Sequence, residues 1–520
     1  MPRRHISSAA GALAAAVLFA VQAPSYAQQA EDRALRGSIG LLDGPVAPLP
    51  PVVVPVGPSI DGVEPVAGEG LGGLGDDPAP GTDLQGTGGL GDQPSDLEAE
   101  EIVLPEDEIG LTPPTRAIFE TTQIHSALLP EPHDLDPFVP IGIRIGTFLI
   151  FPEVEVGAAM TNNVLASPSG ARSDAGPQVT PKVRVDSDWV RHFLSFEANA
   201  DRIWYSEFPV ADTKNYQLLT RGRLDVTRRT RLFGEIEKSQ VQEGPSSVSI
   251  TDIALADTTL LHEQHATAAF EHTFNRLTVR LTGTIADYDY SETGDETDPT
   301  LSGPVPFADV RDYQEILGTL RSTYEFQPRW AGFIETTLNE RKYAEPVAVE
   351  GFRRGSTGWT AVAGVNLRLA GTLFGEIAAG WGEQQPIDDS FVEVSGPLVN
   401  GNLIWMATPS TKFEFIARSA ISETTLENSA GAVDHFFQLG LQQAFWRYLV
   451  LGVYGSFEVA DFAGDPQVDQ RAKLGATAEY YFNPLLSVYG RYEHTNFTSS
   501  PDSSSDFAED EFKVGLKLRR

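Results

Sequence analysis

The fold class follows from a stretch near the middle of the chain, Asn275-Arg276-Leu277-Thr278-Val279-Arg280-Leu281-Thr282-Gly283-Thr284-Ile285. Leu277, Val279, Leu281 and Ile285 alternate with Thr278, Arg280, Thr282 and Thr284. Successive side chains of a β-strand point to opposite faces, so this alternation predicts a strand with one apolar and one polar face. Asn275-Arg276 has the character of a tight turn that leads into the strand.

The same pattern recurs from about residue 138 to residue 520, where strand-forming segments are separated by short turns and by long loops. The expected short turns are Asp186-Ser187-Asp188, Arg228-Arg229-Thr230, Asn275-Arg276, Gln327-Pro328-Arg329, Ala370-Gly371-Thr372, Thr408-Pro409-Ser410, Trp446-Arg447 and Asn483-Pro484. The expected long loops include Asp287 to Asp309, Ala344 to Ser356 and Asn496 to Asp510. A half-buried strand of a soluble protein would alternate in the same way. The long series of hairpins with short turns and long loops instead favours a membrane-spanning barrel.

The number of strands follows from the turns. Eight short turns make eight hairpins; one further strand carries Val154, Val156, Ala158 and Met160, and a last one runs from Phe512 to Arg519. We therefore expect an all-β fold, an antiparallel up-and-down transmembrane β-barrel of about eighteen strands over residues 138–520. An even count places both termini on the short-turn side, which is the periplasmic side in such barrels.

Aromatic residues gather beside the expected short turns: Phe326, Trp330, Phe445, Trp446, Tyr448, Tyr480, Tyr481 and Phe482. Amphipathic rings prefer the level of the lipid headgroups, so we expect an interfacial girdle there. The ordinary preference of aromatic residues for strands is the alternative explanation.

The N-terminus has the features of an export signal, expected over residues 1–27. Arg3 and Arg4 precede an apolar run, and Ser25-Tyr26-Ala27 supplies small residues before an expected cleavage between Ala27 and Gln28. The run is short for a membrane anchor. We therefore expect an outer-membrane protein, with outer-membrane lipid and the barrel assembly machinery as partners.

Residues 28–137 are rich in Pro, Gly and acidic residues, and no Lys or Arg lies between Arg36 and Arg116. Such a composition buries too little apolar surface to fold, so this segment is expected to be a disordered periplasmic arm. The whole chain carries a formal net charge of −34. That charge argues against nucleic acid as a partner, because phosphate contacts require Lys and Arg.

Charged residues on the expected inner face are the candidate pore-lining set: Arg321, Glu325, Arg418, Glu479, Arg491, Glu493, Lys513 and Lys517. Mixed charge inside a barrel favours a lumen that contains water, because uncompensated charge in a dry core is costly. Barrels of 16–18 strands are wide enough for an aqueous channel. A lumen filled by interlocking side chains, or by the N-terminal segment, stays open as the alternative.

The residues indicate neither catalysis nor a cofactor. The chain has no cysteine, which excludes disulfides and cysteine–zinc sites. His262-Glu263-Gln264-His265 has the wrong spacing for the helical zinc motif, and a polar loop or lumen position is favoured. The acidic clusters Asp287-Tyr288-Asp289-Tyr290 and Asp295-Glu296-Thr297-Asp298 are expected in a solvated outer loop. We therefore expect no enzyme, no cofactor and no metal site.

The segment around Gly146, Phe148 and Pro152, followed by Asn162-Asn163, resembles the start of the barrel in the putative beta-barrel porin 2 family. The resemblance extends over the barrel region in hairpin spacing. It implies a porin-like channel linked with the secretion of exopolysaccharide, with polysaccharide and periplasmic export components as partners. A general diffusion porin, or a closed barrel with a structural or interaction role, are the alternatives.

Overall fold

The computed structural model describes residues 135–520 apart from 136, 139, 243–258, 293–310, 328, 345–352, 370–371, 425, 427–428 and 502–505. The expected signal peptide, its cleavage between Ala27 and Gln28, and the expected disordered arm up to residue 134 lie outside these residues. The one described helix is the 3-10 turn η1 (Pro209–Ala211). No described helix is long and apolar enough to cross a membrane.

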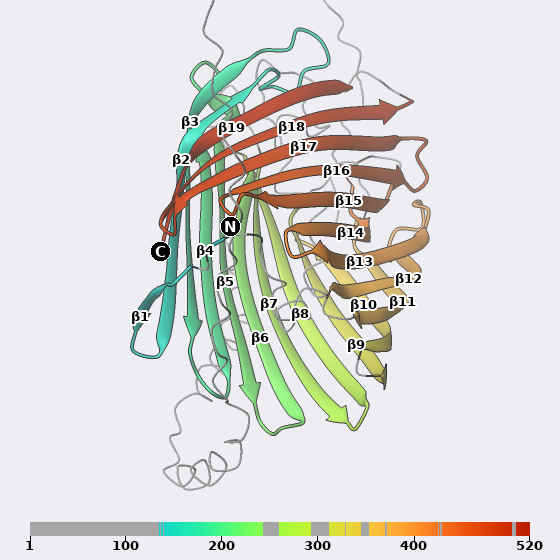
Figure 1. Ribbon diagram of the computed structural model, residues 1–520. Helices are drawn as coiled ribbons and strands as arrows, with labels where there is room; N and C mark the ends of the chain where they lie inside the picture. The colour runs from blue at the N-terminus through green and yellow to red at the C-terminus, as the bar shows by residue number, and fades with distance from the viewer. Residues whose placement is uncertain are drawn as a thin grey trace, which may run out of the picture. The chain divides into compact units, whose positions relative to one another are not determined.

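Eighteen strands of the described chain form one closed antiparallel ring (Figure 1). They are β2 (Phe148–Thr161), β3 (Asp174–Ser187), β4 (Phe193–Ile203), β5 (Thr213–Asp225), β6 (Thr230–Gln242), β7 (Thr259–Phe274), β8 (Leu277–Glu292), β9 (Tyr313–Gln327), β10 (Trp330–Tyr343), β11 (Ser356–Leu369), β12 (Leu373–Pro386), β13 (Val394–Thr408), β14 (Thr411–Ser422), β15 (Ala432–Phe445), β16 (Leu449–Phe462), β17 (Val468–Asn483), β18 (Leu486–Ser500) and β19 (Phe507–Arg519). Each strand pairs with its neighbours in sequence, which is the up-and-down topology. The expected fold and strand count are confirmed.

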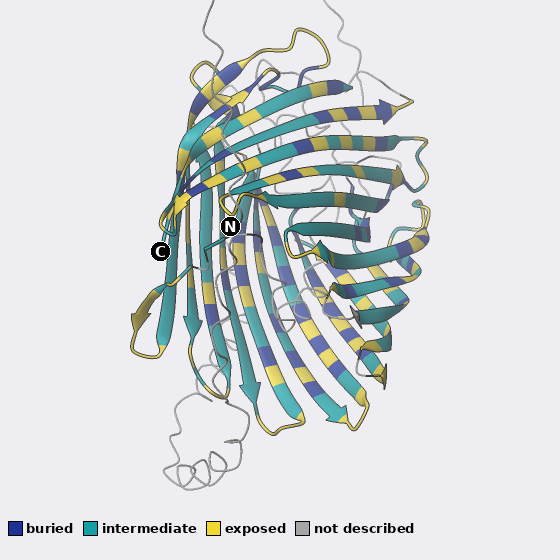
Figure 2. Ribbon diagram, viewed as in Figure 1, coloured by how far each residue is buried: buried dark blue, intermediate teal, exposed yellow. Residues whose placement is uncertain are grey.

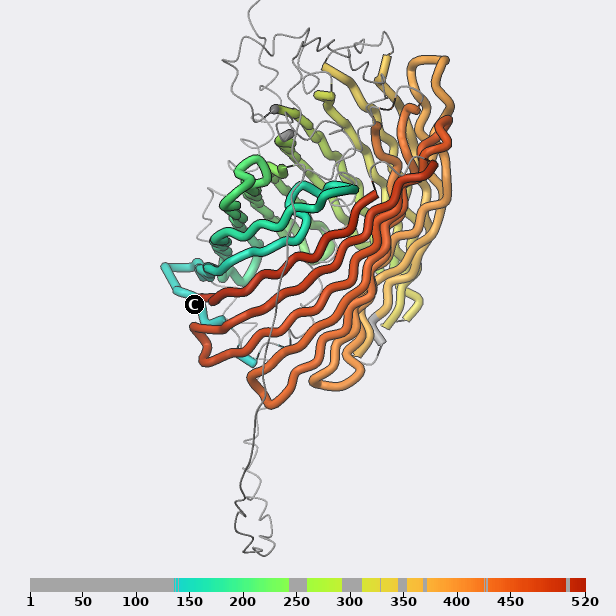
Figure 3. The backbone as a smooth tube through the Cα atoms, turned by 90° about the horizontal axis from the view of Figure 1, so that it is seen from above, coloured from blue at the N-terminus to red at the C-terminus, as the bar shows by residue number. Residues whose placement is uncertain are grey.

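The ring closes where β19 pairs with β2. Their register joins Glu511 to Thr161 at one end and Arg519 to Glu153 at the other. Seen along a second direction, β2 and β3 lie beside the last strands of the chain (Figure 3). Closure leaves neither strand with an unpaired edge, so every strand of the ring has a hydrogen-bonding partner on both sides.

Most of the expected short turns lie between the strands that they join, but Asp186 and Ser187 belong to β3 and the turn follows them at 188–192. Pro328, Ala370 and Gly371 of the expected turns, and most of the expected loops Asp287 to Asp309 and Ala344 to Ser356, lie outside the described residues. Asn275-Arg276 joins β7 to β8, and Trp446-Arg447 lies between β15 and β16. Asn275 has a φ of 55°, and Trp446 and Arg447 have φ of 46° and 70°. These left-handed values are those that tight hairpin turns require. The first strand of the ring begins, and the last one ends, at this same short-turn end of the barrel.

Three strands extend farther than the sequence predicts. β8 includes Asp287 to Glu292, β18 continues to Ser500, and β19 begins at Phe507, so the expected loops Asp287 to Asp309 and Asn496 to Asp510 are wrong at these ends. The physical reason is that alternation persists there: Tyr288 and Tyr290 are buried on one face. A short strand β1 (Ile143–Ile145), which pairs with β2 as a hairpin, was not expected.

Burial alternates along the strands, as Figure 2 shows by its bands of colour. On β19, Phe512, Val514, Leu516 and Leu518 are exposed, and the residues between them are partly buried. Exposed apolar side chains on a closed ring form an outer face suited to lipid.

Most of the expected girdle is exposed beside the short turns: Phe326, Trp330, Phe445, Trp446, Tyr448, Tyr480 and Phe482. The rings of Phe326 and Trp330 stack with centroids 4.6 Å apart. Tyr481 is the exception, because it is buried on the inner face below the guanidinium of Arg519.

Candidate functional site: the charged lumen

The strand register determines which side chains share the inner face. Residues directly opposite each other on paired strands lie on the same face. Arg321 lies opposite Glu335 on β10 and Arg280 on β8. Glu155 on β2 lies opposite Lys517 on β19. These positions alternate with the exposed apolar residues, so the inner face carries charges both at β8 to β10 and at β2 and β19.

One wall of the lumen, formed by β7 to β12, is tightly packed by ion pairs. Arg321 is only 3% exposed and contacts Glu335 at 3.2 Å and Glu376 at 2.7 Å. Its guanidinium also lies 3.6 Å from the ring centroid of Phe333. Glu376 belongs to β12, three strands away from β9 around the ring. Because the strands between β9 and β12 curve around the lumen, the two side chains can meet only on the inner side of the wall. Their contact therefore crosses part of the lumen.

A second buried contact joins β10 to the end of β14. Arg341 is fully buried; its Nε lies 2.9 Å from Glu315, and it also pairs with Glu423, just after β14. Its Nη2 donates to the backbone carbonyl of Ile421 at 2.8 Å. Tyr343 donates its hydroxyl to Glu423 at 2.7 Å. Every part of Arg341 therefore has an acceptor, which is what a buried cation requires.

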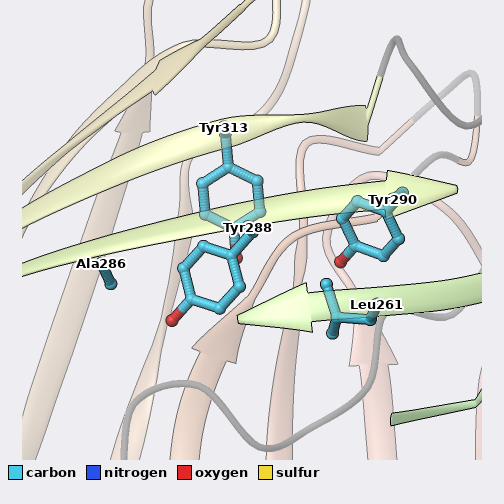
Figure 4. Packing of buried hydrophobic residues seen from close by; sticks show 5 residues of the cluster. All are labelled: Leu261, Ala286, Tyr288, Tyr290 and Tyr313. Atoms are coloured by element: carbon cyan, nitrogen blue, oxygen red, sulfur yellow. The ribbon is translucent and has the colours of Figure 1, made fainter. Parts of the chain in front are cut away.

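Tyrosines close the packed wall at its long-loop end. The rings of Tyr288 and Tyr313 stack with centroids 4.4 Å apart, and Tyr343 stacks on Tyr313 at 5.3 Å. Figure 4 shows Tyr288 and Tyr313 side by side on neighbouring strands, with Leu261 close to Tyr290. Tyr288, Tyr290 and Tyr313 are all buried, so stacked aromatic side chains fill this end of the wall.

The other wall, formed by β16 to β19 with β2 and β3, is more open. We call its charged residues the lumen strip: Glu155, Lys182, Lys473, Glu479, Arg491, Glu493 and Lys517. Arg491 and Lys473 keep 38% and 35% of their side-chain surface exposed, although both are ion-paired. Charges that are paired and yet this exposed border a space that holds water.

Glu155 is the centre of the lumen strip. It is 1% exposed and accepts hydrogen bonds from both terminal nitrogens of Arg491, at 2.9 and 3.0 Å. Lys182 and Lys517 each lie 3.5 Å from its carboxylate. Such a two-pronged contact between a guanidinium and a carboxylate is the geometry that holds both groups firmly. One carboxylate therefore orients three cations along the wall.

The structure places the eight sequence-predicted residues as follows. Four of them lie together in the lumen strip: Glu479, Arg491, Glu493 and Lys517. Lys513 lies beside the strip and pairs with Glu511 at 2.9 Å, and Arg321 belongs to the packed wall. Glu325 is exposed at the short-turn end of β9, and Arg418 lies on the inner face of β14. Their role in lining a pore stays a prediction. Glu155 and Lys182 were missed, although Glu153 and Glu155 alternate with Val154 and Val156 and so carry the same signal.

The histidine pair shows no metal-binding arrangement. His262 and His265 lie on opposite faces of β7, because they are an odd number of residues apart in a strand. His262 contacts the hydroxyl of Ser291, and His265 packs edge-on against Tyr288. No group of three or more metal-ligating side chains occurs in the part of the chain that the structure describes.

A closed ring of strands, apolar outside and charged inside, defines a porin-like β-barrel of the outer membrane. The chain belongs to the family described as putative beta-barrel porin 2, whose profile matches residues 136–520. The expected family is therefore confirmed, and with it the outer membrane as the location of the barrel.

Several solved structures are similar to the barrel. OpdL of Pseudomonas aeruginosa is 11% identical with a TM-score of 0.38, over 72% of this chain and 99% of that one. The outer membrane protein opdK of the same organism is 9% identical with a TM-score of 0.38, over 71% and 99%. The siderophore receptor PirA of Acinetobacter baumannii is 7% identical with a TM-score of 0.38, over 71% and 80%. A search of curated proteins finds no match. Likenesses this distant carry no substrate over to this chain.

Proposed function

We propose that the barrel is an open channel, through which small hydrophilic solutes cross the outer membrane along the lumen strip. The observation that carries the proposal is the contrast between the two walls. Arg321 and Arg341 are buried in the packed wall, whereas Arg491 and Lys473 are more than a third exposed. A pathway for water therefore runs beside the strip and not through the centre of the packed wall.

The charges of the strip suit a channel of modest selectivity. Lys473 pairs with Glu493 at 2.7 Å, and Lys517 pairs with Glu479 at 3.1 Å, so cations and anions alternate along the wall. Alternating fixed charges offer polar contacts to a solute of either sign, and solvent screens them over about 8–10 Å at physiological salt. Neither sign dominates the path.

The test is the conductance of the purified full-length protein in a planar lipid bilayer. We expect discrete steps of current, and a small reversal potential in a salt gradient. A correctly folded barrel that passes no current at any voltage, with residues 28–136 present or deleted, contradicts the proposal. The deletion variant separates a closed wall from a lumen blocked by the N-terminal segment.

A narrower proposal is that the transported solute is a polysaccharide on its way out of the cell, with periplasmic export components as partners. What favours it is the family resemblance, together with aromatic rings among the strip charges. Tyr454 donates its hydroxyl to Glu493, and the Arg491 guanidinium lies 4.4 Å from the ring centroid of Tyr489. Loss of secreted polysaccharide on deletion of the gene, restored by the wild-type chain, is the expected result. Unchanged secretion contradicts this proposal and leaves the diffusion channel standing.

We also propose that both termini lie in the periplasm. The proposed channel catalyses no reaction. β2 begins and β19 ends at the short-turn end, so the orientation of the barrel decides that of both ends. An epitope placed after Arg520 should be inaccessible to antibody in intact cells and accessible after the outer membrane is permeabilised. Labelling of intact cells contradicts the orientation.

A further inference from the structure

The short-turn rim of the barrel carries arginines that take no part in the ion-pair networks of the lumen. They are Arg191, Arg228, Arg229, Arg276, Arg329 and Arg447, and each is exposed. None of them forms an ion pair with another described residue. Of the acidic residues beside these turns, Asp188 pairs with Arg144 at 2.5 Å and Asp225 with Arg223 at 3.2 Å, whereas Glu325 is exposed next to Arg276 and balances at most one of the six arginines. The rim therefore has a surplus of positive charge.

Five of these arginines belong to four consecutive hairpins. Arg191 lies between β3 and β4, Arg228 and Arg229 between β5 and β6, Arg276 between β7 and β8, and Arg329 between β9 and β10. Because these hairpins follow one another around the ring, the five side chains form one continuous arc on the rim. On the long-loop side, by contrast, the loop between β12 and β13 carries Asp388, Asp389 and Glu393 and no basic residue.

An exposed apolar side chain accompanies the arginine at each of these turns. Val190 precedes Arg191, Val226 precedes Arg228, Phe274 precedes Arg276, Trp330 follows Arg329, and Trp446 precedes Arg447. Val190 is 91% and Trp446 is 85% exposed. Aromatic rings on the outside of a barrel lie at the level of the lipid headgroups. A guanidinium one or two residues away is thus held at the same level, within reach of phosphate groups.

At the turn Trp446-Arg447, the aromatic residue and the arginine both occupy a strained backbone conformation. Both residues have left-handed φ values, which glycine or asparagine adopt with little strain and which Trp and Arg rarely adopt. Residues retained in such conformations occur preferentially at binding sites.

We infer that the arginine rim binds the phosphate-bearing headgroups of anionic lipids in the leaflet that the short turns face. The guanidinium group matches phosphate with two parallel hydrogen bonds, and the neighbouring aromatic or aliphatic side chain contacts the acyl region. In the orientation proposed above, this leaflet is the inner one. The inference concerns the outer rim, and so it does not depend on whether the lumen conducts.

The test compares lipid binding to matched double variants by native mass spectrometry of the full-length protein in a zwitterionic detergent. The rim variant is Arg276→Gln with Arg329→Gln; the control, on exposed arginines of the long-loop side, is Arg172→Gln with Arg353→Gln. We expect the wild type to retain phosphatidylglycerol at least about fivefold better than phosphatidylcholine, since each basic residue near an anionic surface contributes to that preference. The rim variant should lose most of the preference, and the control should keep it.

Two further arms make the result decisive. Arg276→Lys with Arg329→Lys keeps the charge and removes the two-pronged geometry, so an intermediate preference is expected. Inorganic phosphate in excess should not displace phosphatidylglycerol. Displacement by free phosphate, equal retention of the two lipids by the wild type, or equal preference in the rim and control variants would each overturn the inference. Bilayer conductance of the rim variant should remain that of the wild type.

Discussion

Arg321 illustrates how a single residue stabilises the packed wall. It is buried, it pairs with Glu335 and Glu376, and it contacts the ring of Phe333. Substitution Arg321→Met keeps an unbranched apolar stem, removes the guanidinium and leaves two partly buried carboxylates without their cation. Breaking such a pair costs about 3–5 kcal/mol, so the free energy of unfolding in detergent should fall by that order.

The double variant Arg321→Met with Glu376→Gln separates this charge effect from lost packing. Its loss of stability should be smaller than the sum of the two single losses, because Glu376 is no longer an unpaired charge. Additive losses, measured by the denaturation midpoint of the folded band on gels, would show that the two side chains do not interact.

A substitution of Glu155 tests whether ions pass along the lumen strip. Substitution Glu155→Gln removes the carboxylate that faces Arg491, Lys517 and Lys182, and so leaves the strip more positive. The ratio of potassium to chloride permeability should fall, by up to about fivefold, because a unit charge about 4 Å away in water is worth about 1 kcal/mol. Glu340→Gln is the control: this residue pairs with Lys342 on the outer face of β10. An unchanged reversal potential in Glu155→Gln would place the ion path elsewhere.

At the scale of the element, Gly375 is a position where the backbone of the neighbouring strand leaves room only for glycine. It has a φ of 124°, and a Cβ atom there would lie 1.9 Å from the carbonyl oxygen of Asn402 on β13. Gly375→Ala should therefore separate β12 from β13 locally and reduce the yield of folded barrel. Gly318→Ala is the matched control, because a Cβ atom at that position meets nothing within 4 Å. Equal yields of the two variants would contradict the β12–β13 geometry.

We expect the stability of the loop between β12 and β13 to depend on pH. Hydrogen bonds from the Ser390 hydroxyl, and from the backbone N–H groups of Arg353 and Ser390, lower the pKa of Asp388. A carboxyl whose pKa is lowered by folding stabilises the loop above its ordinary pKa, and this stabilisation is lost as the pH falls through the folded pKa. Hydrogen exchange of residues 387–393, corrected for its intrinsic rate, should therefore rise at acid pH. In Asp388→Asn this pH dependence should disappear; if it persists, another group controls the loop.

The turns and faces of the strands could be predicted from sequence, but the contacts across the lumen could not. Alternation of apolar and polar residues marks Arg321 and Glu376 as facing inward, yet nothing in the sequence says that β9 and β12 bring them within 2.7 Å. That contact depends on the curvature of the wall and on the register of three successive strand pairs. The ends of β8, β18 and β19 were missed because the alternation continues into segments whose acidic residues suggest loops.

For the whole molecule, the absence of cysteine from the sequence provides a direct test of the water-filled pathway. Any cysteine introduced by substitution is the one thiol in the protein, and a charged thiosulfonate reagent reaches it only from water. Glu493→Cys places the thiol in the lumen strip, Glu335→Cys places it in the packed wall, and Leu474→Cys places it on the outer face of β17.

The most direct measurement of the central claim is the current through these three variants in a planar bilayer while the reagent is added. We predict that current through Glu493→Cys falls in discrete steps as each barrel reacts, that Glu335→Cys reacts more slowly, and that Leu474→Cys is unaffected. Conducting barrels in which modification of Glu493→Cys leaves the current unchanged, or in which Leu474→Cys alone responds, would contradict a pathway along the lumen strip.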